Sequence, residues 1–517
     1  MRWFVTVLAV FMAAFAGPTV AQTPDNRLVV GQVAEPKSLD PQTVTATNDF
    51  RILTNVFDGL VRFTPGTLAV EPALATDWTI SDDQLTYTFN LREGVTFHDD
   101  TSFDADAVKF TFERMLDPDH PQHGTGPFPL AFFFSSIEAV EVVDPMTVAF
   151  QLEEPYAPFL SNLAHPAGLI VSPSAVAERD EAYGRAPVGT GAFRFAEWQP
   201  NSHILLARNA DYWDGVPPTE SVEFRPVPEA ADRASAMLSG DFDIMVEVPA
   251  DRLATFRNNP NFQVHETTGP HLWFLILNTK EGPLSDKRVR QAVNYAIDKQ
   301  GLIDTVLKGT ADVAAGPIPP AFDWANDGSV APYPHDPEKA RNLIRQAGVE
   351  GAALTFYVAE GGSGMLDPVA MATAIQADLK SVGLNARIET YEWSTFLSNV
   401  NPGLAGKADM AEMAWITNDP DTLPYLALRS DAMPQTGGFN AGYYANPEID
   451  RLLSEARATT DLKTRGMLYN RVQAIVHDEA PWAFIANWKQ NAVSRRAVES
   501  FDMEPSFLLD LSDVAKQ

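Results

Sequence analysis

One stretch of the sequence places a strand, a helix and a second strand in immediate succession, and this order constrains the fold more than any other feature. The first strand is expected at Leu354–Val358 and the second at Ala386–Tyr391. Asp367 and Pro368 start the helix between them, and Gly383 ends it. Its apolar stripe consists of Met371, Ile375, Leu379 and Val382. A strand–helix–strand order within about forty residues is typical of a mostly parallel sheet.

Other segments extend the α/β prediction along the chain. Leu85–Leu91 alternates apolar and polar residues, which predicts a half-buried strand. Ser285, Asp336–Pro337 and Asn446–Pro447 are predicted to start three further helices. A chain of 517 residues exceeds one hydrophobic core. The fold class is therefore α/β, with mixed sheets in more than one lobe.

The charge of the chain excludes some partners. The net charge is -30, and the acidic residues are spread along the sequence. Nucleic acid and anionic lipid both require clustered Lys and Arg, so neither is an expected partner. A dispersed negative charge favours a soluble protein.

The N-terminus has the pattern of a signal peptide, expected at residues 1–21. Arg2 supplies a positive charge, Trp3–Ala16 is almost wholly apolar, and Thr19–Ala21 is a small-residue cleavage site. An uncleaved anchor is the alternative, and the shortness of the apolar run favours cleavage. The chain has no cysteine, so it lacks the residue that carries the lipid of a bacterial lipoprotein. We therefore expect a protein free in a Gram-negative periplasm after cleavage.

Enzyme motifs are weak in this sequence. Without cysteine, thiol nucleophiles and thiolate metal sites are excluded. Gly189–Gly191 lacks the third glycine of a dinucleotide loop, and Gly361–Gly364 matches a nucleophile elbow only loosely. His120 and His123 lie in a Pro/Gly-rich loop, which favours surface histidines over metal ligands. We expect no catalytic residue, no metal and no cofactor, with a secreted hydrolase as the competing hypothesis.

A binding site is predicted from aromatic residues near strand ends. Tyr391, Trp393 and Trp415 lie at or just after predicted strands, where core packing is the alternative role. In open α/β sheets, ligands bind beyond the carboxyl ends of strands. This places the loop 359–364 and the loop after Trp415 near a site with apolar walls and a few polar contacts. The candidate ligand-binding residues are Glu360, Trp393, Trp415, Thr417, Asn418 and Asp419.

A set of short segments lies in order along the chain: Leu74–Trp78, Tyr87–Asp99, Ala105–Val108, Pro187–Phe193, Arg208–Gly215, Ser239–Ile244, Leu277–Thr279, Val289–Val293, Ala296–Asp298, and Tyr444–Asp450 with Leu452 and Leu453. Together these segments resemble the signature of the peptide/nickel/opine class of ABC transporter extracellular substrate-binding proteins. Two residues depart from that signature: Asp100 and Ala107 stand where the family often has Gly and Asp, and they affect a turn and a helix start.

The resemblance implies a bilobed periplasmic-binding-protein fold that closes on a peptide or peptide-like solute. The first lobe would comprise residues 22–53, 188–272 and 488–517, with an inserted domain at 54–187 and a second lobe at 273–487. The closed protein, expected to be a monomer, would then dock on an ABC permease and ATPase complex in the inner membrane.

The resemblance also bears on the solute. Dipeptide binders of this family hold the peptide amine with an Asp three residues after a Trp that matches Trp415, where this chain has Asn418 followed by Asp419. They hold the carboxylate with an Arg in the loop before the Asp367 helix, and residues 359–364 contain no Arg. A longer peptide, an opine, a glutathione-like solute and a nickel chelate stay open as alternatives.

Overall fold

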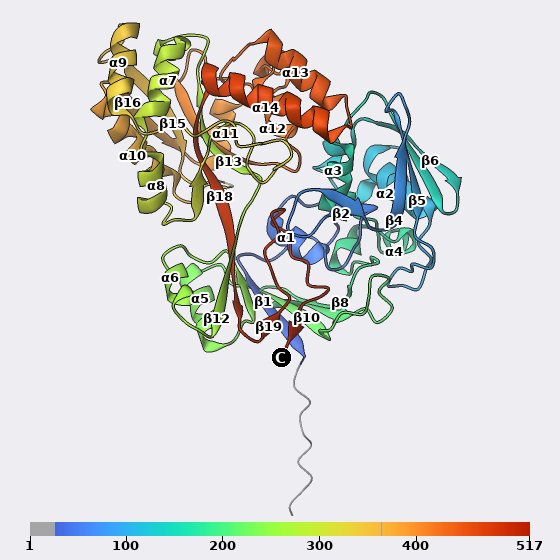
Figure 1. The fold of residues 1–517 in the computed structure, drawn as a ribbon. Helices are drawn as coiled ribbons and strands as arrows, with labels where there is room; N and C mark the ends of the chain where they lie inside the picture. The colour runs from blue at the N-terminus through green and yellow to red at the C-terminus, as the bar shows by residue number, and fades with distance from the viewer. Residues whose placement is uncertain (1–25, 363) are drawn as a thin grey trace, which may run out of the picture.

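The computed structural model describes residues 26–362 and 364–517, which form two lobes connected by shared strands (Figure 1). The predicted signal peptide, 1–21, lies outside the described residues. Twelve strands form one sheet that runs through both lobes, in the order β16-β15-β17-β13-β18-β11-β1-β10-β9-β8, with β12 and β14 also paired to β18. In the described part of the chain, no helix combines the length and apolar character needed to cross a bilayer.

The second lobe contains the predicted strand–helix–strand unit. β15 pairs in parallel with β16, from Ala353 opposite Asn385 to Ala359 opposite Tyr391. The side chain of Asp367 caps α10, and the apolar stripe of that helix is buried, which confirms the prediction. The elements of this lobe are β13 (His271–Leu277), α7 (Lys287–Ala296), α8 (Lys299–Thr305), β14 (Ala311–Val313), α9 (Pro337–Ala347), β15 (Ala353–Ala359), α10 (Pro368–Ser381), β16 (Asn385–Tyr391), α11 (Trp393–Val400), β17 (Met410–Ile416), α12 (Thr422–Leu428), α13 (Pro447–Arg457), α14 (Leu462–Glu479) and the start of β18 (Trp482–Arg495).

Two helix starts in this lobe agree with the sequence and one does not. Asp336 and Asn446 cap α9 and α13 with their side chains, as predicted. Ser285, however, lies in a 3₁₀ turn at Pro283–Ser285, and Asp286 is the residue that caps α7. The prediction for Ser285 was wrong by one residue because the carboxylate of Asp286 accepts the Arg288 amide at 2.8 Å.

The first lobe is built around β1, which pairs in parallel with both β10 and β11. β8 and β9 extend the sheet in antiparallel pairs. The elements of this lobe are β1 (Arg27–Gln32), α1 (Thr47–Leu53), β8 (Phe193–Gln199), β9 (His203–Arg208), β10 (Ser221–Pro226), α5 (Ala230–Ser239), β11 (Ile244–Val246), α6 (Leu253–Arg257), β12 (Phe262–Thr268), β19 (Val498–Glu499) and β20 (Ala515–Lys516).

A separate antiparallel sheet, β4-β5-β7-β6, lies to the right in Figure 1. In β5, Tyr87, Phe89 and Leu91 are buried and alternate with more exposed residues, which confirms the predicted half-buried strand. The elements of this region are β2 (Val61–Phe63), β3 (Val70–Pro72), β4 (Ala75–Ile80), β5 (Thr86–Leu91), α2 (Ala105–Leu116), β6 (Ile137–Asp144), β7 (Thr147–Leu152), α3 (Phe159–Ala164) and α4 (Pro173–Arg179).

This region shares its core with the first lobe. One continuous cluster of buried apolar side chains reaches from Leu28 and Val30 on β1 to Phe89 on β5. The second lobe has its own cluster, which includes Phe274 and Phe484. We therefore expect the antiparallel sheet to move together with the first lobe. The division of the chain at residues 54, 188, 273 and 488 stays a prediction.

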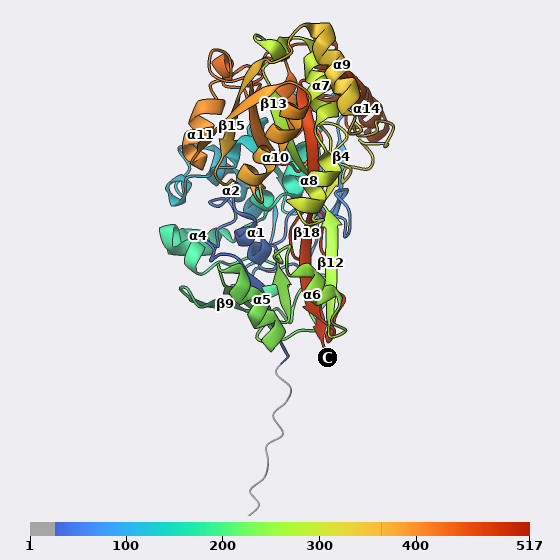
Figure 2. The same ribbon diagram turned by 90° about the vertical axis from the view of Figure 1, so that its left-hand side faces the viewer.

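The lobes are connected through β18, which runs from one into the other (Figure 2). Its first half pairs with β13 and β14, and from Lys489 onward it pairs with β12 and β11. Beside this crossover, Gly269 and Pro270 connect β12 to β13. A Cβ atom on Gly269 would lie 1.9 Å from the ring of Phe507, so a larger residue does not fit there. Two chain crossings side by side form the hinge between the lobes.

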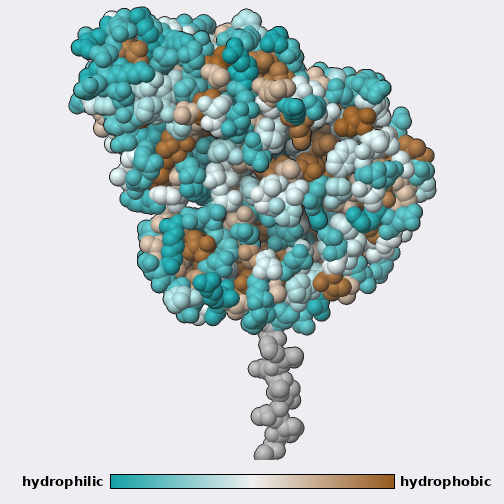
Figure 3. All heavy atoms as spheres, in the orientation of Figure 1, coloured by the Kyte–Doolittle hydropathy of each residue, from teal (hydrophilic) through white to brown (hydrophobic). Residues whose placement is uncertain are grey.

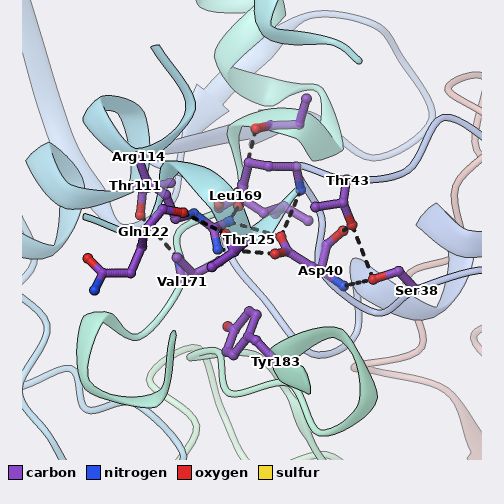
Figure 4. Close-up of polar contacts among 12 residues, drawn as sticks. Ser38, Asp40, Thr43, Thr111, Arg114, Gln122, Thr125, Leu169, Val171 and Tyr183 are labelled. Atoms are coloured by element: carbon purple, nitrogen blue, oxygen red, sulfur yellow. Dashed lines mark hydrogen bonds and ion pairs between the residues drawn. The ribbon is translucent and has the colours of Figure 1, made fainter. Parts of the chain in front are cut away.

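A buried ion pair holds α2 against the segment that follows β1 (Figure 4). Arg114 donates to both carboxylate oxygens of Asp40, at 2.9 and 3.1 Å, and both side chains are almost fully buried. Gln42 continues the link by donating to the carbonyl oxygen of Leu169 at 2.8 Å. The ring of Tyr183 lies 5.9 Å from the guanidinium carbon of Arg114. These contacts fix the antiparallel sheet to the first lobe.

Replacing Asp40 with Ala should lower the free energy of unfolding by about 3–5 kcal/mol, because it leaves the Arg114 charge buried without a partner. Urea unfolding measures the change. The matched control is Glu113→Ala, which removes an exposed i,i+4 pair with Lys109 and should cost under about 1 kcal/mol. Equal losses in the two variants would contradict the assigned role of the pair.

Candidate ligand-binding cleft

A cleft of about 740 Å³ lies between the two lobes, next to the hinge. Figure 3 shows apolar side chains gathered along the hollow between the upper lobe and the region of the antiparallel sheet. Both lobes contribute to the lining. The aromatic lining residues are Phe50, Phe63, Phe132, Phe133, His165, Phe274, Trp393, Trp415, Phe439, Trp482 and Phe507.

The walls of the cleft carry no formal charge. Among the described residues that line it, none is Asp, Glu, Lys or Arg. The polar side chains in the lining are neutral ones: Thr45, Thr47, His165, Asn401, Thr417, Asn418, Thr422 and Ser506. Such a site binds through apolar contact and neutral hydrogen bonds.

Four of the six predicted residues line this cleft: Trp393, Trp415, Thr417 and Asn418. Trp393 begins α11 and its ring stacks on Phe396, while Trp415 is the penultimate residue of β17 and its ring meets Phe439 edge-on. Both tryptophans are half-buried, in contrast to core Trp273, which is 1% exposed. The structure brings the four together, and their role in binding stays a prediction.

The carboxylates of Asp419 and Glu360 lie elsewhere. Asp419 is 1% exposed, accepts from Arg465 at 2.8 Å and accepts from the hydroxyl of Ser161 at 3.0 Å. The side chain of Glu360 is exposed and outside the cleft lining. One carboxylate is thus engaged in a buried ion pair and the other faces solvent, and the role of both residues in binding stays a prediction.

Hydrogen bonds bridge the lobes at one end of the cleft. Asn418 donates to the side-chain oxygen of Asn162 at 2.7 Å, next to the contact between Ser161 and Asp419. The amide of Ala157 donates to the carbonyl oxygen of Arg457 at 2.8 Å. Thus α3 contacts the loop after β17, and the segment that leads into α3 contacts the end of α13. We call these contacts the lobe bridge.

His165 lies in the cleft lining with its protonation fixed by a backbone contact. Its Nδ1 accepts the amide hydrogen of Ala167 at 3.1 Å, so the proton of the neutral ring is on Nε2. Burial lowers the pKa of His165 to about 3, which keeps the ring neutral. Its ring meets Phe50 and Phe133 edge-on, with 5.1 Å between centroids in each case.

Sequence reasoning missed His165, Phe50, Phe274, Trp482 and Phe507. They come from five separate parts of the chain, and no spacing relates them. Phe132 and Phe133 carry a weak sequence signal, because Ala131–Phe134 is a short apolar run. In the structure this run forms a 3₁₀ turn, and Phe132 is 57% exposed.

The comparisons with known proteins agree on one family. A family model described as bacterial extracellular solute-binding proteins, family 5 Middle, matches residues 69–434. Di/tripeptide-binding protein 2 of Pseudomonas aeruginosa is 30% identical over 524 residues, with 98% of each chain covered. Heme-binding protein A of Haemophilus influenzae is 34% identical over 450 residues, covering 84% of this chain and 81% of the relative.

The solved structures show the same fold. The structure of HbpA2 from Haemophilus parasuis has a TM-score of 0.87 and 29% identity, and the match covers 95% of this chain and 100% of that one. The bilobed α/β fold with mixed sheets, expected from the resemblance, is thereby confirmed.

Stability should fall below pH 6.5 because His271, beside the hinge, is buried as the neutral ring. Its Nδ1 accepts the Trp488 amide at 3.0 Å and its Nε2 contacts the Gly364 carbonyl oxygen at 2.8 Å. Burial lowers the pKa of His271 to about 4 from the ordinary 6.5. Between these values the unfolded chain binds a proton that the folded protein does not, so the free energy of unfolding decreases as the pH falls.

From pH 7 to pH 5, His271 should account for about 2 kcal/mol of that decrease. Urea unfolding of His271→Gln should therefore show a shallower loss than the unsubstituted protein. An unchanged slope in His271→Gln would contradict the assignment.

Proposed function

Because the chain belongs to the bacterial extracellular solute-binding proteins of family 5, we propose that it is the periplasmic receptor of an ABC importer. It captures a peptide or peptide-like solute between its lobes and delivers it to a permease and ATPase complex in the inner membrane. The observation that carries the proposal is the cleft of about 740 Å³ between two hinged lobes, lined by both. The relative named a di/tripeptide-binding protein, aligned over 98% of this chain, supports a peptide as the solute.

Closure of the lobes follows from the hinge and the lobe bridge together. The hinge at β18 and Gly269 lets the second lobe rotate against the first. The lobe bridge at Asn162 and Asn418 lies directly at the cleft, so a bound solute and the bridge stabilise the same closed arrangement. The permease then recognises this arrangement.

We propose further that the protein returns its solute chemically unchanged. Acyl transfer by a serine requires a base within hydrogen-bond reach of the hydroxyl. The one histidine of the described lining, His165, carries its proton on Nε2 and accepts a backbone amide at Nδ1, so neither nitrogen is a free base. The secreted protein acts as a monomer, without cofactor, after cleavage near Ala21.

A heme is the second candidate solute, because the walls are aromatic and uncharged and one relative is named a heme-binding protein. His165 is not suited to bind the iron, since its Nε2 carries the proton while Nδ1 accepts the Ala167 amide. A heme would be held by its apolar faces alone. Hemin titration followed by absorbance distinguishes this candidate from a peptide.

The direct test of the proposal is to identify the solute that the protein carries. The protein is purified from periplasm without denaturation, and bound small molecules are released by acid and analysed by mass spectrometry. A peptide or peptide-like solute in near-stoichiometric amount is the expected result. A recovered product of hydrolysis, or an empty protein that binds no peptide, would contradict it.

Replacing Trp415 with Ala should weaken peptide binding more than folding. The ring lines the cleft and is half-buried, so its loss removes a contact worth about 2 kcal/mol at a binding hot spot. The matched control is Trp273→Ala on the adjacent strand, which should cost about 3–5 kcal/mol of stability because that side chain is fully buried.

Calorimetric titration and thermal melts separate the two effects in both variants. A large loss of melting temperature with unchanged affinity in Trp415→Ala would assign that ring to the core instead.

A further inference from the structure

The described lining of the cleft offers no carboxylate to a positively charged group. A buried ammonium requires a carboxylate nearby, because removing the charge from water is costly without one. None of the described lining residues is acidic. A carboxylate next to the lining could turn toward a solute only if its present contacts left it free to do so. The contacts of these carboxylates therefore decide the question.

Five carboxylates lie next to lining residues in the chain, and each already makes a contact within the protein. Asp421 is paired with Arg457, and Glu412 accepts the indole N–H of Trp273 at 2.7 Å. Asp419 is paired with Arg465 and Ser161. Glu392 caps α11 by accepting the amides of Ser394 and Thr395 at 2.9 and 3.2 Å. Asp49 is 1% exposed and accepts the amide of Lys37. One oxygen each of Asp49, Glu412 and Asp421 has no hydrogen-bond partner among the described residues, but these side chains are buried outside the cleft lining. A solute ammonium in the cleft would therefore have no carboxylate to pair with.

The same cleft is well supplied with neutral hydrogen-bond donors. The indole nitrogens of Trp393 and Trp415 have no hydrogen-bond partner among the described residues, and both rings line the cleft. The Nε2–H of His165 is likewise without a partner in this part of the chain. Indole N–H groups only donate, so they suit carbonyl and carboxylate oxygens and repel an ammonium.

We propose that the solute buried in this cleft carries bulky apolar groups and hydrogen-bond acceptors but no ammonium group. Among peptides, this selects amine-blocked or cyclic ones with aromatic or aliphatic side chains over ordinary zwitterionic dipeptides. The inference rests on the proposed function, because it names the class of peptide that the same cleft takes. Asn418, whose amide also donates to Asn162 in the lobe bridge, is a neutral residue of the lining at which a carboxylate can be introduced by one substitution.

The test compares four forms of one dipeptide by calorimetric titration of the purified protein: Phe-Phe, Phe-Phe amide, N-acetyl-Phe-Phe and N-acetyl-Phe-Phe amide. Acetylation of the amine should tighten binding at least about tenfold, which is about 1.4 kcal/mol. Amidation of the carboxylate should change affinity less, since N–H donors also stabilise a carboxylate. Because the four peptides share both side chains, differences among them report the end groups alone.

Two variants examine the residues behind the preference. Trp415→Phe keeps the aromatic wall and removes the N–H donor, so it should weaken binding of N-acetyl-Phe-Phe about five- to tenfold. Asn418→Asp places a carboxylate in the lining, so it should reduce or reverse the preference for the acetylated peptide. A melting temperature within a few degrees of the unsubstituted protein shows that each variant is folded.

Tighter binding of the peptides that have a free amine than of the acetylated peptides would overturn the inference. The proposed function as a peptide receptor would then still stand. Failure of all four peptides to bind would overturn the inference and the proposed function together. Higher affinity for the acetylated peptides, together with a shift of the Asn418→Asp variant toward peptides with a free amine, supports both the inference and the proposed function.

Discussion

The pairing of β18 with both lobes is the constraint on which the rest of the molecule depends. One strand of 14 residues completes the sheet of the second lobe with its first half and that of the first lobe with its second half. Because neither lobe has a complete sheet without it, the two lobes stay attached to each other at this strand. In the described part of the chain, the lobes are connected only here and at Gly269, and the cleft lies next to these two crossings.

The walls of that cleft show how a shared fold acquires its own specificity. Function within a common architecture is set by the residues at the site, and relatives of this chain carry names as different as di/tripeptide-binding and heme-binding protein. In this chain, the carboxylates next to the cleft lining accept hydrogen bonds or pair with arginines elsewhere in the protein. The remaining surface combines aromatic rings with neutral donors. The walls of the cleft are uncharged because the acidic side chains next to them make their contacts with other parts of the protein.

The sequence predicted elements whose pattern is local. The parallel pairing of β15 and β16 and the cap at Asp367 followed from periodicity and turn chemistry over a few dozen residues. Trp393 and Trp415 were found because strand ends converge at one edge of a sheet. The ion pair of Asp419 could not be predicted, because nothing in the sequence indicates that Arg465, 46 residues away, is its partner. His165 and Phe50 reach the cleft only through the packing of the antiparallel sheet on the first lobe, which no local pattern encodes.

The measurement that tests the account most directly is a crystal structure of the protein with N-acetyl-Phe-Phe amide bound. The account predicts the peptide between the lobes, with its side chains against Trp393 and Trp415 and its carbonyl oxygens toward the indole nitrogens. Density for the peptide outside this cleft, or a blocked cleft with the lobes in direct contact across it, would contradict the assignment of the site.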